Sequence, residues 1–212
     1  MKVRAMVSLA LVLGAVAASG QSASSKCPVT GDAKDPAGKA LATLMNRVAV
    51  PTAQDIDPAI TFIALQEPGL DSPRWSNKRA VRVNAWVRAV SEAPPSAAHC
   101  HARDSTGRDI RLELVVAPGV EKDPGRVLFA NVTPAAVQRA LAKSVDVWTV
   151  QTLKRRLERQ WISIDGWLLY NNTPAYPARN SGAPKGTFAR GSAWEIFPVT
   201  GFTVLNGPPR PG

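Results

Sequence analysis

The chain has 212 residues and a formal net charge of +10, from 26 lysines and arginines against 16 aspartates and glutamates. This length suits one domain with a substantial core plus a short additional segment, and it argues against two large domains. The basic balance favours an anionic partner such as nucleic acid, an acidic polysaccharide or a lipid surface, although it equally keeps an exported protein soluble.

Residues 1–20 have the pattern of a secretory signal peptide. Lys2 and Arg4 precede an apolar run at residues 5–18, which is too short and too rich in small side chains to span a bilayer comfortably. We expect cleavage before Gln21, with a retained N-terminal anchor as the alternative. The exported protein would be periplasmic or secreted, without a transmembrane segment. It would keep 24 basic and 16 acidic residues, a net charge of about +8.

Cys27 and Cys100 are the only two cysteines of the chain. Because disulfides persist in exported proteins, we expect a bridge between them, with two free thiols as the alternative. The bridge would close a loop of about 74 residues, for which the chain-entropy model gives at most ~4 kcal/mol of stabilisation. It requires the two Cα atoms to lie within bridging range, which the sequence does not decide.

Residues 21–75 precede the main domain. Residues 21–36 are small and polar and predict a tether. Residues 38–48 carry apolar side chains at helical spacing, which predicts a short amphipathic helix. Residues 60–65 fit either an irregular strand or a second short helix, and the prolines of residues 68–73 predict a linker. The apolar positions of the first helix are Leu41, Leu44, Met45 and Val48.

Five strands are expected in the main domain, residues 76–207, with residues 208–212 as a tail. Their approximate ranges are 78–90, 109–116, 126–132, 161–170 and 193–205. The first strand alternates apolar with polar or large side chains, as a half-buried strand does. Gly166 indicates a bulge, and the segment 198–201 indicates a kink. We expect four apolar residues of the last two strands in the core: Ile164, Leu168, Ile196 and Val204.

A helical insert separates the third and fourth strands. Thr133 followed by Pro134 predicts a helix start, because the hydroxyl caps backbone amides and proline suits the first helical position. Asp146 would cap a second helix that runs to Arg159. The inner faces are expected at Val137, Ala140 and Leu141 of the first helix and at Val147, Val150, Leu153 and Leu157 of the second. The second helix also carries a basic exterior at Lys154, Arg155, Arg156 and Arg159.

Three strands, a helical insert and two strands is the element order of the oligonucleotide/oligosaccharide-binding (OB) barrel. This mainly-β Greek-key design closes on itself and so removes its sheet edges. The sequence therefore predicts an OB-like five-stranded β-barrel plus a short N-terminal helical segment. Another small antiparallel barrel or an open α+β sheet fits the same elements.

The motifs GWLLYN and AWEIFPVTGFTVL, with AHCH, DIRLELV and FANVTP, resemble a group of uncharacterised exported bacterial proteins with an OB-like barrel. In that group the last strand commonly reads WEIHPVT. The resemblance covers roughly residues 81–205. It implies histidine where this chain has Arg111 and Phe197, and glutamate where it has Asn131. Any chemistry that those positions support in the group is therefore in doubt here, because phenylalanine neither ligates a metal nor moves a proton.

Catalytic and metal-binding patterns are sparse. His99 and His101 flank Cys100 and are weak candidates for zinc or copper ligands, because a shared metal needs a bent backbone and a third ligand nearby, and a bridged Cys100 is not a thiolate ligand. We interpret the segment as a surface loop with a disulfide. The chain has no glycine-rich phosphate loop, GxSxG or HExxH motif. Glu113 and Glu195 could face each other across strands, but we interpret them as ordinary surface residues.

The tryptophans of the predicted strands are expected to fill or cover the barrel. An alternative places Trp86 on the open barrel face as a stacking platform beside basic side chains. The candidate ligand-binding residues are therefore Arg82, Trp86, Arg88 and Arg111.

The sequence favours a periplasmic or secreted, non-enzymatic binding module for an anionic polymer, either nucleic acid or acidic polysaccharide. It indicates no cofactor and leaves the oligomeric state open. Two other functions stay open: a metal-dependent hydrolase or nuclease on an OB-type barrel, and a structural or interaction domain with no small ligand.

Overall fold

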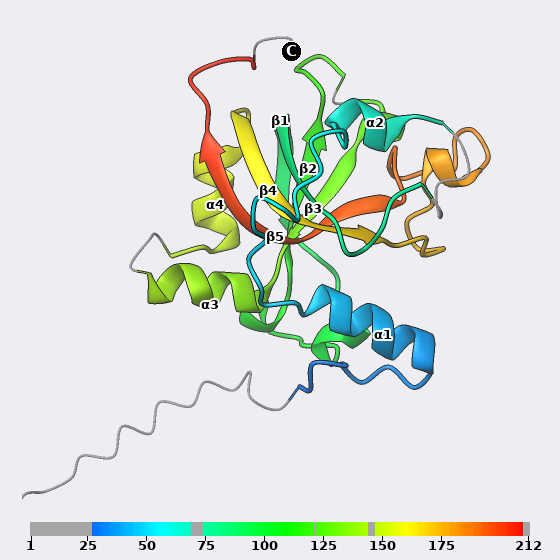
Figure 1. Ribbon diagram of the computed structural model, residues 1–212, viewed down its shortest axis with the longest axis vertical. Helices are drawn as coiled ribbons and strands as arrows, with labels where there is room; N and C mark the ends of the chain where they lie inside the picture. Colours follow the sequence, from blue (N-terminus) through cyan, green and yellow to red (C-terminus); the bar gives the residue numbers. More distant parts are fainter. Residues whose placement is uncertain (1–26, 69–73, 121, 144–146, 210–212) are drawn as a thin grey trace, which may run out of the picture.

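The structure is a computed structural model that describes residues 27–68, 74–120, 122–143 and 147–209. The predicted signal peptide lies outside the described residues. Five strands form a closed barrel in the order β1-β2-β3-β5-β4, which confirms the OB-like prediction (Figure 1). The strands are β1 (Ala80–Glu92), β2 (Ile110–Val115), β3 (Leu128–Val132), β4 (Trp161–Tyr170) and β5 (Trp194–Val204). Only β3 and β5 pair in parallel; the other neighbours are antiparallel.

Alternation along each strand sends one set of side chains into the barrel and the other set outward, because successive residues of a strand point to opposite faces. Of the four residues that we expected in the core, Ile164, Leu168 and Ile196 have no exposed surface. Val204, near the end of β5, is only partly buried but packs against the same core. In β1 the inward set is Val81, Val83, Ala85 and Val87, as predicted.

Gly166 lies at a bulge in β4, where the register with β5 shifts on both sides of it. A Cβ atom at this position would lie 2.5 Å from Cγ2 of Ile196 and 2.6 Å from the carbonyl oxygen of Pro198. The position therefore requires glycine, because no side chain fits between the two strands. The predicted bulge is confirmed. The kinked segment after it contains a cis Phe197–Pro198 bond and remains within the single strand β5.

The insert between β3 and β4 contains α3 (Pro134–Ala142) and α4 (Val150–Leu157), which lie on one side of the barrel (Figure 1). Thr133 caps α3 as predicted. The predicted start of the second helix is wrong: Thr149 forms the N-cap of α4, and Asp146 lies outside the described residues. Two predicted inner positions are also wrong, because Leu141 is 48% and Val147 is 56% exposed.

These two errors have a simple physical reason. The side of α3 that faces the barrel is filled by Ala136 and Ala140, whose small side chains let the helix approach closely. Val147 precedes α4, so it has no place in the apolar stripe of that helix, which is buried at Leu153 and Leu157.

The N-terminal segment contains α1 (Pro36–Met45) and α2 (Phe62–Gln66), so residues 60–65 adopt the helical alternative. Helix α1 ends at Met45, and Val48 is 67% exposed, which corrects the predicted extent of its apolar face. Ile60 and Leu65 are fully buried in the same core as the barrel strands. No described helix is long and apolar enough to cross a membrane.

The Cys27–Cys100 disulfide is present, with Cα atoms 5.8 Å apart, and confirms the predicted bridge. Arg47 provides a second attachment of α1. Its guanidinium donates hydrogen bonds to the carbonyl oxygens of Leu168 (2.9 Å) and Phe197 (3.2 Å) and lies 5.0 Å from the ring centroid of Trp167. Burial lowers the pKa of Arg47 to about 10, which still leaves it charged at neutral pH.

Candidate ligand-binding face

A second apolar cluster lies outside the barrel, on the outer face of β1, β2 and β3. It consists of the buried residues Val115, Val127 and Phe129, with Trp86, Val120 and Tyr176 packed against them. Val115 and Phe129 point outward because their neighbours Leu114 and Leu128 belong to the barrel core. A barrel of this kind carries its ligand on the outer side of these strands, between the loops that flank them.

Trp86 and Trp161 continue this cluster onto β4. They are direct cross-strand partners, with ring centroids 5.8 Å apart in an edge-to-face arrangement, and both are partly exposed. We name the surface formed by Trp161, Trp86, Phe129 and Tyr176 the aromatic stripe. The expectation that strand tryptophans fill the barrel holds for Trp194, which is 1% exposed, but not for Trp86 and Trp161.

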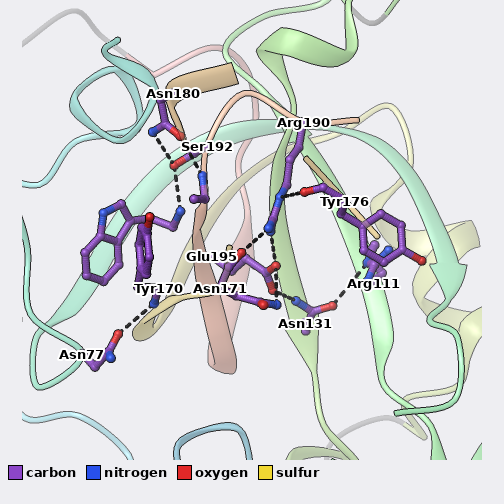
Figure 2. Close-up of polar contacts among 12 residues, drawn as sticks. Asn77, Arg111, Asn131, Tyr170, Asn171, Tyr176, Asn180, Arg190, Ser192 and Glu195 are labelled. Carbon is purple, nitrogen blue, oxygen red and sulfur yellow. Dashed lines mark hydrogen bonds and ion pairs between the residues drawn. The ribbon is translucent and has the colours of Figure 1, made fainter. Parts of the chain in front are cut away.

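Arg111 lies at one end of the aromatic stripe, in the angle between two nearly perpendicular rings. Its guanidinium carbon is 4.3 Å from the centroid of Phe129 and 4.4 Å from that of Tyr176. Nε makes a long contact of 3.5 Å with Oδ1 of Asn131, its cross-strand partner (Figure 2). The terminal nitrogens of Arg111 meet no acceptor or carboxylate among the described residues. The two rings therefore restrict the orientation of the guanidinium and leave its terminal nitrogens available to a ligand.

The two other predicted arginines are engaged by carboxylates. Arg82 forms a two-pronged ion pair with its cross-strand partner Asp165, with both N–O distances at 2.7 Å. These hydrogen bonds and the negative charge raise the pKa of Arg82. Arg88 lies 3.2 Å from the carboxylate of Glu113. Of the three predicted arginines, Arg111 is thus the one whose charge no described carboxylate meets.

The loop between β4 and β5, residues 171–193, lies beside α2 (Figure 1), and its Tyr176 packs against Phe129 of β3 in the stripe. Arg190 holds this loop in place and is fully buried. Its guanidinium pairs with Glu195, donates to the carbonyl oxygen of Asn171, and donates to the carbonyl oxygen of Tyr176 at 3.0 Å. One side chain thereby connects β5, the start of the loop and the residue that stacks on Arg111.

A polar network links Arg190 to Arg111 (Figure 2). Glu195 accepts hydrogen bonds from the side-chain amides of Asn131 at 2.8 Å and Asn171 at 3.0 Å, besides its pair with Arg190. Asn131 then contacts Arg111. Charges buried at this depth are stable only when paired and hydrogen-bonded, and this network satisfies that condition.

Arg190, Glu195 and Tyr176 were not predicted as parts of this site. Glu195 is 2% exposed, so its interpretation as a surface residue is wrong. It does not face Glu113 either, because β3 lies between β2 and β5. The available signal was a carboxylate within the otherwise apolar strand AWEIFPV, since a buried charge calls for a partner. Arg190 lies five residues before it.

The two histidines beside the disulfide have different partners. Nε2 of His99 lies 2.7 Å from Oδ1 of buried Asp109, whereas Nε2 of His101 lies 3.6 Å from Asp32. Cys100 is engaged in the bridge. Within the described ranges, no group of three or more His, Cys, Asp or Glu side chains is arranged to hold a metal ion.

Arg111, Asn131 and Phe197 lie on the neighbouring strands β2, β3 and β5. Arg111 and Asn131 are cross-strand partners. Phe197 lies two residues after Glu195 on β5 and is 2% exposed. In this chain the first two positions thus belong to the polar network, while the third is apolar and buried.

The basic exterior of α4 belongs to a helix that packs against β1, where the backbone N–H of Arg159 donates to the carbonyl oxygen of Val87, the neighbour of Trp86. Lys154, Arg155 and Arg156 are exposed, and Lys154 lies 3.7 Å from Glu158 one turn away. A shallow cavity of about 490 Å³ opens between Trp148 and this helix, with Arg155 and Arg156 at its edge.

The fold and this face define an OB-like β-barrel with an aromatic outer stripe that ends in a stacked arginine. Comparisons of the chain with protein-family models, with curated proteins and with solved structures found no match.

Proposed function

We propose that the protein is an exported binding module that holds an anionic polymer on the outer face of β1, β2 and β3. The observation that carries the proposal is Arg111, whose guanidinium packs against the rings of Phe129 and Tyr176 while its terminal nitrogens meet no described acceptor. A fixed guanidinium fork binds carboxylate or phosphate through two parallel hydrogen bonds and loses little conformational entropy in doing so.

The aromatic stripe supports the same proposal. Trp86, Trp161 and Tyr176 are partly exposed and provide aromatic surface on which a base or a sugar ring can stack. Together with Arg111 they offer a ligand both stacking and an ionic contact. Export is part of the proposal and is supported by the disulfide, which suits an oxidising compartment.

A matched pair of arginine variants tests this function. Arg111→Gln and Arg82→Gln remove the same charge from the same barrel, but Arg82 already pairs with Asp165. Binding of heparin, polygalacturonate and a single-stranded oligothymidylate would be measured by tryptophan fluorescence at 20 and 150 mM salt. We expect Arg111→Gln to weaken binding at least tenfold, the scale of a lost charge-assisted contact. Arg82→Gln should change it less than twofold.

Two results would overturn the proposal. One is that no polymer binds at 20 mM salt, in which case the net charge of the chain serves solubility alone. The other is that both variants weaken binding equally, which would mean that overall charge, and not the stacked arginine, attracts the polymer.

A further inference from the structure

The charges on the candidate face are nearly balanced. Of the three arginines on the barrel strands, Arg82 and Arg88 are offset by Asp165 and Glu113, and only Arg111 meets no described carboxylate. A nucleic acid presents one phosphate per nucleotide, so its binding proteins line the path of the backbone with several free cations. Here a ligand with an anion in every unit would meet two carboxylates along the face and a single unmatched arginine.

A row of uncharged polar side chains crosses the barrel next to the tryptophan pair. Asn84 on β1, Ser163 on β4 and Thr203 on β5 are successive cross-strand partners, and all three point away from the core. We name them the polar row. None of their side chains makes a hydrogen bond to a described residue. Their hydroxyl and amide groups both donate and accept, as the hydroxyl groups of a sugar do.

The polar row and the tryptophan pair lie two residues apart along β1 and β4. Trp86 follows Asn84 by two positions, and Trp161 precedes Ser163 by two, so all four side chains share the outer face. A partly exposed indole ring beside free hydroxyl and amide groups suits a sugar ring, which has an apolar face and a polar rim. From Trp161 on β4 to Phe129 on β3 the stripe crosses three strand spacings, about 14 Å.

Resting on the proposed function, we propose that the anionic polymer is a carbohydrate in which carboxylates are separated by uncharged sugars. Arg111 holds one carboxylate. An uncharged sugar of the same chain stacks on Trp86 and Trp161 and forms hydrogen bonds with the polar row. The tryptophan pair at one end of the stripe is separated from Arg111 at the other end, which matches a ligand whose carboxylates are separated by uncharged sugars. The other strand arginines, Arg82 and Arg88, are already paired with carboxylates, which disfavours a ligand with an anion in every unit.

Four probes of similar length test this ligand class on the purified protein. They are a hyaluronan octasaccharide, with a carboxylate on every second sugar, its carboxyl-reduced form, an oligogalacturonate with a carboxylate on every sugar, and an oligothymidylate. We expect the hyaluronan probe to bind at least tenfold more tightly than the oligothymidylate at 150 mM salt. Reducing its carboxyls should cost about tenfold, and its affinity should fall only about threefold to fourfold between 50 and 200 mM salt, because one ion pair is made.

A double variant, Asn84→Ala with Ser163→Ala, separates the sugar contacts from the ionic contact. Both positions lie on the outside of the barrel, so the thermal midpoint should stay close to that of the parent. We expect this variant to weaken hyaluronan binding severalfold and to leave oligothymidylate binding unchanged, whereas Arg111→Gln weakens both.

The outcomes distinguish this inference from the function on which it rests. If the oligothymidylate or the oligogalacturonate binds most tightly, the proposed ligand class is wrong. If Arg111→Gln still weakens the binding of that probe, the proposed binding face is nevertheless supported. The class is also wrong if the double variant leaves hyaluronan binding intact. If no probe binds at any salt concentration, the binding function itself fails.

Discussion

Two arginine–carboxylate pairs on the outside of one barrel contrast in a single respect, their exposure to water. Arg190 and Glu195 are 0% and 2% exposed beneath the loop of residues 171–193, whereas Arg82 and Asp165 are 61% and 27% exposed on the open β1–β4 side. In water an ion pair replaces favourable hydration and contributes little. Once buried, the same pair cannot lose one member without leaving an uncompensated charge.

The difference in exposure also distinguishes the roles of the covered side, beneath the loop of residues 171–193, and the open β1–β4 side. The covered side is a fixed support, in which Arg190 holds the backbone of Tyr176 and so the ring that stacks on Arg111. The open side keeps its polar groups at the surface, where a ligand can reach them. The stacked arginine lies where the two sides meet.

The largest expected effect comes from breaking the buried pair. Glu195→Leu should lower the free energy of unfolding by about 3–5 kcal/mol, because Arg190 stays buried without its counter-charge. Chemical denaturation would measure it. The double variant Arg190→Met with Glu195→Leu should be less destabilised than the single one, since no charge is left alone. A double variant that loses more than the single one would contradict this account.

A cavity in the barrel core between β4 and β5 should lower the free energy of unfolding nearly as much. Leu168 has no exposed surface and pairs with Ile196 across β4 and β5. We expect Leu168→Ala to lower the free energy of unfolding by about 2–5 kcal/mol in a denaturant titration. A loss below about 0.5 kcal/mol, the size of a surface substitution, would show that the register of β4 is misassigned.

An intermediate effect is expected at the boundary between the two sides. Tyr176→Ala removes the edge-to-face contact with Phe129, at 5.8 Å between centroids, and one of the two rings that hold Arg111. The free energy of unfolding should fall by about 1–2 kcal/mol. Tyr176→Phe keeps the ring and is the control, with stability and polymer binding close to those of the parent. Equal losses in both variants would assign the effect to the hydroxyl instead.

The smallest effect belongs to the exposed pair. Arg82→Gln should change the free energy of unfolding by less than about 1 kcal/mol, and adding salt should shrink the difference further. Thermal denaturation at low and high salt would measure it. A loss comparable to that of Glu195→Leu would remove the distinction between the two sides.

Local patterns along the chain were enough to predict much of this fold. Alternation in β1, the Thr-Pro start of α3, the glycine bulge in β4 and the element order all depend on neighbours within a few residues. The disulfide followed from the presence of two cysteines alone. Where the pattern was ambiguous, as at Leu141, the side chain that faces the barrel was decided by close packing of the smaller Ala136 and Ala140.

The sequence by itself therefore determined the five strands and their inward faces, because these follow from periodicity and turn chemistry. An open α+β sheet fits the same elements, so the closure of the strands into a barrel was decided by the tertiary structure. It also indicated Arg111 and Trp86 as residues of an outer face. Only the tertiary structure decided which arginines keep an unmatched charge. Arg82 and Asp165 form an ion pair although 83 residues separate them in the sequence. Glu195 is buried beneath the loop of residues 171–193, and Tyr176 of that loop packs against Arg111 on β2. Those contacts depend on strand register and loop placement, which no local pattern encodes.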